Sequence, residues 1–296
     1  MTADLPEPEG QPRPQAFGDG LPDEAAVLEL LRFGEIEVRG RLSDASNATL
    51  YARVALDGAS AGCVYKPVAG ERPLWDFPRH TLARREVAAY ELSVGAGWHV
   101  VPPTVLRDGP FGEGSVQWWV EAGGVDPDGD PLPGEPGAGL VDVVPAGRVP
   151  RGWLHVLDAE GADGRRVALV HADDPTLRRM ALFDAVANNT DRKGGHVLRH
   201  AGGGVFGVDH GLTFNVDDKL RTVLWGWAGE RLDQESCDAL DRLVPELTGG
   251  PLRERLCALL APEEVERTAR RAAALRRRAR FPRPAGQGPA IPWPAF

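Results

Sequence analysis

The chain has 296 residues, and its 34 basic and 43 acidic residues give a formal net charge of −9 at pH 7. This length allows one large domain or two lobes, each with its own core. The negative charge argues against a general nucleic-acid-binding protein, because no overall positive field would attract a phosphate backbone. Apolar runs are too short for a membrane span, and the acidic, Pro-rich start lacks the apolar region of a secretory signal.

Two residue counts refine this picture. The three cysteines stand far apart without CxxC or metal-ligand spacing, which predicts reduced thiols in a cytoplasmic protein. Only three of the 34 basic residues are lysines, namely Lys66, Lys193 and Lys219. A GC-rich genome explains the excess of arginine, so a lysine that persists beside apolar residues needs a specific reason.

The first half of the chain reads as a small sheet with helices. Residues 1–22 are expected to be a disordered tail. Apolar spacing predicts helices over 23–33 and 79–94, and alternation predicts strands over 35–42, 49–56, 61–67, 100–106 and 115–121. The Gly-, Pro- and Asp-rich stretch 122–139 is typical of a linker or an exposed loop.

The second half is mainly helical. Asp174 followed by Pro175 predicts a helix start, with the helix running over 176–188. Two short strands, 196–200 and 205–209, are expected to form a hairpin around a glycine turn. Further helices are expected over 234–246, 251–260 and 262–280, and the last residues are Pro-rich.

The hairpin is the most informative feature for chemistry. In an antiparallel hairpin the start of one strand lies beside the end of the other, so Asp191, His196 and Asp209 are expected to converge. Two carboxylates in such loops suit phosphoryl transfer, because one can orient an acceptor hydroxyl while the other holds a metal ion. The alternative is purely structural, with Asp191 capping a turn and Asp209 ending a strand.

Two motifs in this region resemble a known family. The segment Asn189–Arg192 (NTDR) and the segment Val208–Phe214 (VDHGLTF) are similar to the catalytic and metal-binding loops of the phosphatidylinositol 3-/4-kinase superfamily. The type II phosphatidylinositol 4-kinases and a small bacterial PI3/PI4-kinase-like branch carry comparable motifs. The resemblance implies that Asp191 is the catalytic-loop aspartate and Asp209 the metal ligand. It also suggests that Lys193 or Arg192 neutralises charge near the γ-phosphate of ATP.

The same resemblance assigns roles in the first half. A kinase-like small lobe requires a phosphate-covering turn, a lysine on the third strand and a glutamate on the next helix. Lys66 and Glu86 hold the last two positions, with Glu91 as a competing choice for the helix. A snorkelling lysine and a solvated glutamate are the structural alternatives. The turn and the hinge would add ATP-binding groups from Ser46, Asn47, Thr49, Val120 and Glu121.

The chain departs from the family pattern at the second metal ligand. His196 stands where the family has asparagine. Mg²⁺ prefers oxygen ligands and imidazole suits Mn²⁺ better, so His196 indicates a Mn²⁺ preference, poor ligation or weakened activity. The arginine-rich segment Arg267–Arg280 could contact an anionic membrane, although a solvated helix face is the favoured reading.

Together these features predict an α+β, bilobal protein-kinase-like fold. The expected parts are a small lobe over 23–121, a hinge and insertion over 122–152, a large lobe over 153–280 and a Pro-rich tail over 281–296. The implied function is ATP-dependent phosphoryl transfer, with Mg²⁺ or Mn²⁺, to a lipid, protein or small-molecule hydroxyl. The alternative is a nucleotide-binding module without transfer. Lys66 and Lys193 thus gain candidate roles, and Lys219 has none.

Overall fold

A computed structural model describes residues 21–42, 47–121, 139–161, 163–200, 202–284 and 288–296. The expectations for the tail at 1–20, for Ser46 and for the linker at 122–138 lie outside these ranges. None of the described helices has both the length and the apolar character that crossing a membrane requires.

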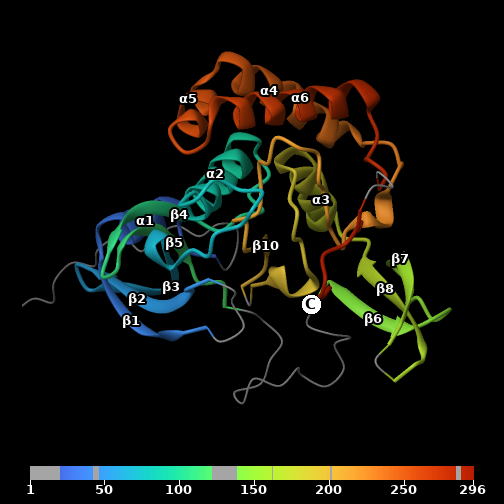
Figure 1. Ribbon diagram of the computed structural model, residues 1–296, viewed down its shortest axis with the longest axis horizontal. Helices are drawn as coiled ribbons and strands as arrows, with labels where there is room; N and C mark the ends of the chain where they lie inside the picture. Colours follow the sequence, from blue (N-terminus) through green and yellow to red (C-terminus); the bar gives the residue numbers. More distant parts are fainter. Residues whose placement is uncertain (1–20, 43–46, 122–138, 162, 201, 285–287) are drawn as a thin grey trace, which may run out of the picture.

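Five antiparallel strands and two helices form the smaller lobe, at the left of Figure 1. The strand order is β1-β2-β3-β5-β4. Alternate residues of β2 and β3 are buried beneath α1, as their alternating sequence predicts. In chain order the elements are α1 (Glu24–Phe33), β1 (Glu35–Arg41), β2 (Leu50–Leu56), β3 (Ala59–Pro67), the 3₁₀ turn η1 (Val68–Gly70), α2 (Leu82–Gly95), β4 (Thr104–Gly109) and β5 (Gly112–Trp118).

The hairpin of β4 and β5 is shifted from the expected ranges of 100–106 and 115–121. Strand β4 begins only at Thr104, after Pro102 and Pro103, which have no N–H group to donate to a neighbouring strand. Gly109 pairs with Gly112 across a tight turn, and Gly112 has a φ of +90°, which glycine adopts without steric cost. Both strands therefore extend to this turn, β4 up to Gly109 and β5 from Gly112, whereas alternation alone indicated a longer loop between them.

The larger lobe is built mainly from helices. Helices α4, α5 and α6 lie across the top of Figure 1, above α3. A short hairpin of β9 and β10 follows α3, as predicted. The elements are α3 (Pro175–Ala187), η2 (Gly194–His196), β9 (Val197–Arg199), β10 (Val205–Gly207), η3 (Trp225–Trp227), α4 (Gln234–Gly249), α5 (Pro251–Cys257) and α6 (Pro262–Arg278).

A three-stranded antiparallel sheet adds to this lobe and lies on the side away from the smaller lobe (Figure 1). It contains β6 (Val141–Pro145), β7 (Trp153–Glu160) and β8 (Arg166–Ala172), in the order β6-β8-β7. The domain boundary expected at residue 152 falls inside this sheet, because β6 pairs with β8. With this addition, the predicted α+β fold of two lobes is confirmed.

Candidate functional site

Lys66 on β3 connects the two lobes through a pair of carboxylates. Its Nζ atom is hydrogen-bonded to Oε1 of Glu86 and lies 2.7 Å from Oδ1 of Asp209. The predicted pairing of Lys66 with Glu86 is present. The competing residue Glu91 instead accepts a hydrogen bond from Arg255 at 2.7 Å.

Helix α2 holds Glu86 in a fixed position. Glu71 accepts the free backbone N–H groups of Leu82 and Ala83 at 3.1 and 2.8 Å, which anchors the first turn of the helix. The Glu86 side chain is buried, and its Oε2 accepts the backbone N–H of His210 at 2.8 Å. One carboxylate therefore fixes both the lysine of the small lobe and the loop that carries Asp209.

Asp191, His196 and Asp209 form a cluster beside this lysine. One potential ligand atom from each lies within 4.8 Å of the other two. His196 Nε2 is 3.5 Å from Oδ2 of Asp209, and His196 Nδ1 lies 2.9 Å from the Asp191 carbonyl oxygen. The second contact places a proton on Nδ1 and leaves the Nε2 lone pair facing Asp209. The convergence predicted from the hairpin is thus present.

The surroundings set the charges of the cluster. The Lys66 ammonium holds the pKa of Asp209 well below its usual range. Burial opposes the charged form of Lys66, but the carboxylates of Asp209 and Glu86 raise its pKa overall. Burial raises the pKa of Asp191 to about 6 and lowers the pKa of His196 to about 4. At neutral pH both aspartates are therefore ionised and His196 is neutral.

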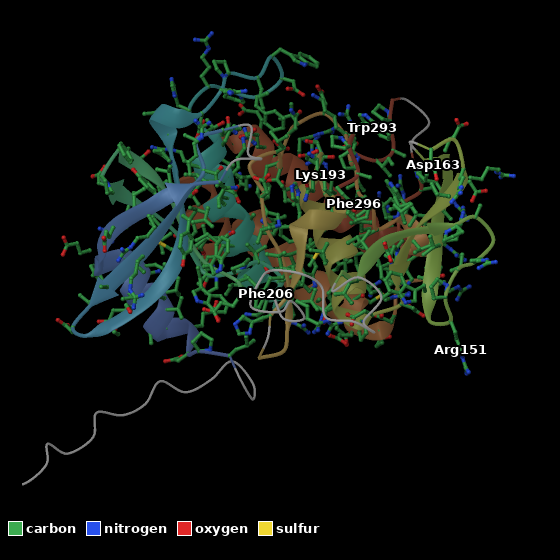
Figure 2. All side chains as sticks on the ribbon, turned by 90° about the horizontal axis from the view of Figure 1, so that it is seen from below. Arg151, Asp163, Lys193, Phe206, Trp293 and Phe296 are labelled. Atoms are coloured by element: carbon green, nitrogen blue, oxygen red, sulfur yellow. The ribbon has the colours of Figure 1, made fainter. Side chains whose placement is uncertain are left out.

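Lys193 is the second cation beside the cluster. Its Nζ atom lies 3.6 Å from Oδ2 of Asp191. The following residue, Gly194, donates its N–H to the carbonyl oxygen of Ala295 at 2.8 Å, and a Cβ atom at Gly194 would collide with the Phe296 ring. Figure 2 shows Lys193 and Phe296 as neighbours. Ala295 and Phe296 therefore support the loop that carries Lys193.

Arg192 differs from the expectation, because its guanidinium group does not enter the cluster. It is fully buried and paired with Asp184 on α3, at 3.0 Å. It also donates to the carbonyl oxygen of Val208 and contacts His210 Nε2 at 2.7 Å. The Arg192 guanidinium is therefore not where the predicted role at the γ-phosphate would require it.

Four of the remaining predicted ATP-binding residues are described, and they belong to the smaller lobe. The Asn47 side chain accepts the backbone N–H of Arg72 at 2.8 Å, and Thr49 is buried at the start of β2. Val120 is buried after β5, and Glu121 beside it is exposed. Ser46 lies outside the described residues.

Asp184 on α3 is a central residue of the site that was not predicted from the sequence. Its carboxylate accepts hydrogen bonds from Asn189 at 2.9 Å and Thr222 at 3.1 Å, besides those from Arg192. A carboxylate inside the apolar stripe of a helix is rarely buried without partners. The position of Asp184 in such a stripe therefore indicated that it has buried hydrogen-bond partners. The position of Asp184 in the sequence does not show which residues these partners are.

The residues of the cluster fit a divalent cation. Two carboxylates and a neutral imidazole supply oxygen and nitrogen donors of the kinds that Mg²⁺ and Mn²⁺ accept. Lys66 and Lys193 on either side would balance the negative charge of a phosphate chain. The arrangement can therefore hold a metal-bound phosphate next to a carboxylate base.

The fold and the cluster define an α+β, two-lobed protein with a Lys–Glu–Asp site between its lobes. No family model matches the chain. It is 52% identical over 274 residues to "Protein Rv2133c" of Mycobacterium tuberculosis (strain ATCC 25618 / H37Rv). The aligned region covers 93% of this chain and 96% of that protein. The chain belongs to the same family as Protein Rv2133c.

The chain is also similar to several solved structures. The crystal structure of a Helicobacter pylori proinflammatory kinase, CtkA, matches 85% of this chain and 94% of its own. The two are 11% identical, and the TM-score is 0.41.

Proposed function

We propose that this protein is an ATP-dependent phosphotransferase of the PI3/PI4-kinase-like type, which transfers the γ-phosphate of ATP to a hydroxyl acceptor. The observation that carries the proposal is the position of Lys66, held by Glu86 and facing Asp209. A surface lysine needs no buried glutamate to hold it, whereas phosphate binding requires a fixed ammonium group. The proposed acceptor is a hydroxyl group of a lipid, a protein or a small molecule.

Each residue of the cluster has a role in this reaction. Lys66 binds the α- and β-phosphates, and Lys193 neutralises charge near the γ-phosphate. Asp191 accepts the proton of the acceptor hydroxyl while the new O–P bond forms and the bond to the β-phosphate oxygen breaks, which releases ADP. The raised pKa of Asp191, about 6, suits a carboxylate that accepts a proton near neutral pH.

Asp209 and His196 are the residues that would hold the metal ion. A bound Mg²⁺ or Mn²⁺ would neutralise charge that develops on the phosphates. His196 faces Asp209 with a free Nε2 lone pair, which favours Mn²⁺ over Mg²⁺.

His196 also favours a second candidate function, a nucleotide-binding module without phosphoryl transfer. In the resembling family asparagine occupies this position and supplies an oxygen ligand. A weaker second ligand would leave ATP bound and its γ-phosphate poorly oriented.

Incubation with γ-labelled ATP in Mg²⁺ or Mn²⁺ separates the two functions. We expect the wild-type chain to release or transfer label, with the higher rate in Mn²⁺. Asp191→Asn should lower the rate by about 100-fold or more and retain stabilisation of the fold by ATP. Asp209→Asn should lose both.

Three results would decide against this account. ATP-dependent thermal stabilisation of the wild type without release or transfer of label, in either metal, supports the non-catalytic module. The absence of any ATP response contradicts both candidates. Equal rates for wild type and Asp191→Asn contradict the role of Asp191.

A further inference from the structure

A second potential binding site lies outside the lobe interface. A groove of about 720 Å³ is lined by α6, by residues 218–221 and by the C-terminal segment, residues 282–284 and 288–290. In Figure 1, α6 lies above α3, and the chain that follows α6 runs down the side of α3 away from the five-stranded sheet. Lys66, Asp191 and Asp209 do not line the groove. Its volume is within the range of about 300–1,000 Å³ typical of small-molecule sites.

The groove is strongly basic in an acidic protein. Eight of its 21 lining residues are lysine or arginine, and one, Asp218, is acidic. Acidic residues outnumber basic ones in the whole chain, so this excess of positive charge is local. A concave site lined by one sign of charge concentrates ligands of the opposite sign.

Several of these cations have no acidic partner in the described ranges. Arg267 and Arg271 share Asp218, at 3.7 and 2.8 Å. By contrast, four of the lining arginines form no ion pair and no side-chain hydrogen bond within the described part of the chain. They are Arg221, Arg277, Arg278 and Arg283. Their guanidinium groups are available to an external anion.

Apolar residues form the rest of the groove. Trp225 and Leu275 line it and are buried, and the Trp225 indole N–H is already bonded to the Ala290 carbonyl oxygen at 2.8 Å. The uncommitted polar groups are thus cationic, and the remaining surface suits the carbon skeleton of a ligand. These features describe a molecule with anionic groups on a compact organic body.

We propose that this groove binds a small soluble organic phosphate that carries two or more phosphate groups. The planar guanidinium of arginine forms paired hydrogen bonds with phosphate oxygens, and several arginines around one groove favour several phosphates over one. The proposal is independent of phosphoryl transfer at the lobe interface. An anionic membrane is the less favoured partner, because the net charge of −9 opposes approach to a negative surface.

Isothermal titration calorimetry of the full chain tests the proposal, with fructose 1,6-bisphosphate and inorganic phosphate as probes in buffer free of divalent cations. We expect the bisphosphate to bind at least about tenfold more tightly than inorganic phosphate. The double variant Arg277→Ala, Arg278→Ala should weaken binding of the bisphosphate by at least about tenfold. Both side chains are exposed, so the fold should persist, and circular dichroism checks this.

Two further variants locate the binding site. The control Arg276→Ala, Arg280→Ala removes the same charge from residues that do not line the groove, and it should bind normally. Lys66→Met should also bind normally, which separates the groove from the lobe interface. Three outcomes would overturn the proposal: equally weakened bisphosphate binding in both double variants, loss of this binding in Lys66→Met, or no binding by the wild type. The proposal would also be overturned if the protein bound vesicles of phosphatidylcholine and phosphatidic acid but did not bind the soluble bisphosphate.

Discussion

At the scale of residues, the three lysines of an arginine-rich chain each have a defined environment. Lys66 bridges Glu86 and Asp209, and Lys193 lies beside Asp191. Lys219, for which the sequence suggested no role, is paired with Asp76 at 3.0 Å and lies over the Trp75 ring. Two of the three lysines thus lie where a compact ammonium group could bind phosphate, for which the wider arginine fork is no substitute.

The buried pair of Arg192 and Asp184 is predicted to be a main source of local stability. Arg192→Ala would leave the Asp184 carboxylate buried without its charged partner. Breaking a buried pair from one side costs about 3–5 kcal/mol, so we expect a decrease of this size in the free energy of unfolding. Urea denaturation monitored by circular dichroism measures it.

Arg199 provides the matched control for this prediction. It forms a partly exposed pair with Asp174 at 3.8 Å, and such pairs contribute less than about 1 kcal/mol. Similar losses of stability in Arg199→Ala and Arg192→Ala would show that the buried network does not hold the loop as described.

At the scale of elements, local patterns predicted most of the secondary structure. Helix α1 was predicted from its amphipathic spacing, and the start of α3 from Asp174 followed by Pro175. Both signals come from residues that are close in sequence, because periodicity and capping act over short distances. The sheet of β6, β7 and β8 was missed. Strand β7 is half exposed along its length and lacks clean alternation, and pairing with β8 stabilises it.

The candidate site was predictable to the extent that its residues lie in motifs. Asp191 and Asp209 were found from their loops, and Lys66 and Glu86 from the order of strand and helix. Which way a loop side chain points depends on contacts that are distant in sequence, and this is why Arg192 was misassigned. The groove between α6 and the C-terminal segment depends on tertiary packing in the same way.

At the scale of the whole molecule, buried His171 is predicted to make stability depend on pH. It lies on β8, where Nδ1–H donates to the Ala172 carbonyl and Nε2 accepts the N–H of Gly226 at 3.0 Å, so it joins the sheet to η3. Burial lowers the pKa of His171. An unfolded histidine binds a proton near pH 6.5, whereas His171 in the fold stays neutral. The unfolded state therefore binds more protons below this pH, and stability falls as the pH falls.

The His171→Gln variant checks this dependence. We expect its melting temperature to fall less than that of the wild type between about pH 6.5 and 5, because glutamine keeps an acceptor and does not titrate. His99 acts in the opposite sense, since the Glu24 carboxylate, 3.6 Å from its Nδ1 atom, raises the pKa of His99 and stabilises the fold at low pH. Parallel pH curves for the wild type and His171→Gln would contradict the role of His171.

The Lys66–Glu86–Asp209 cluster is proposed to support phosphoryl transfer from ATP. The most direct measurement is the rate at which γ-labelled ATP loses its label, compared between Lys66→Arg and Lys219→Arg. We predict a decrease of about 100-fold or more for Lys66→Arg, because the broader guanidinium does not fit between Glu86 and Asp209, and a change within about twofold for Lys219→Arg. Equal rates in the two variants would contradict the claim.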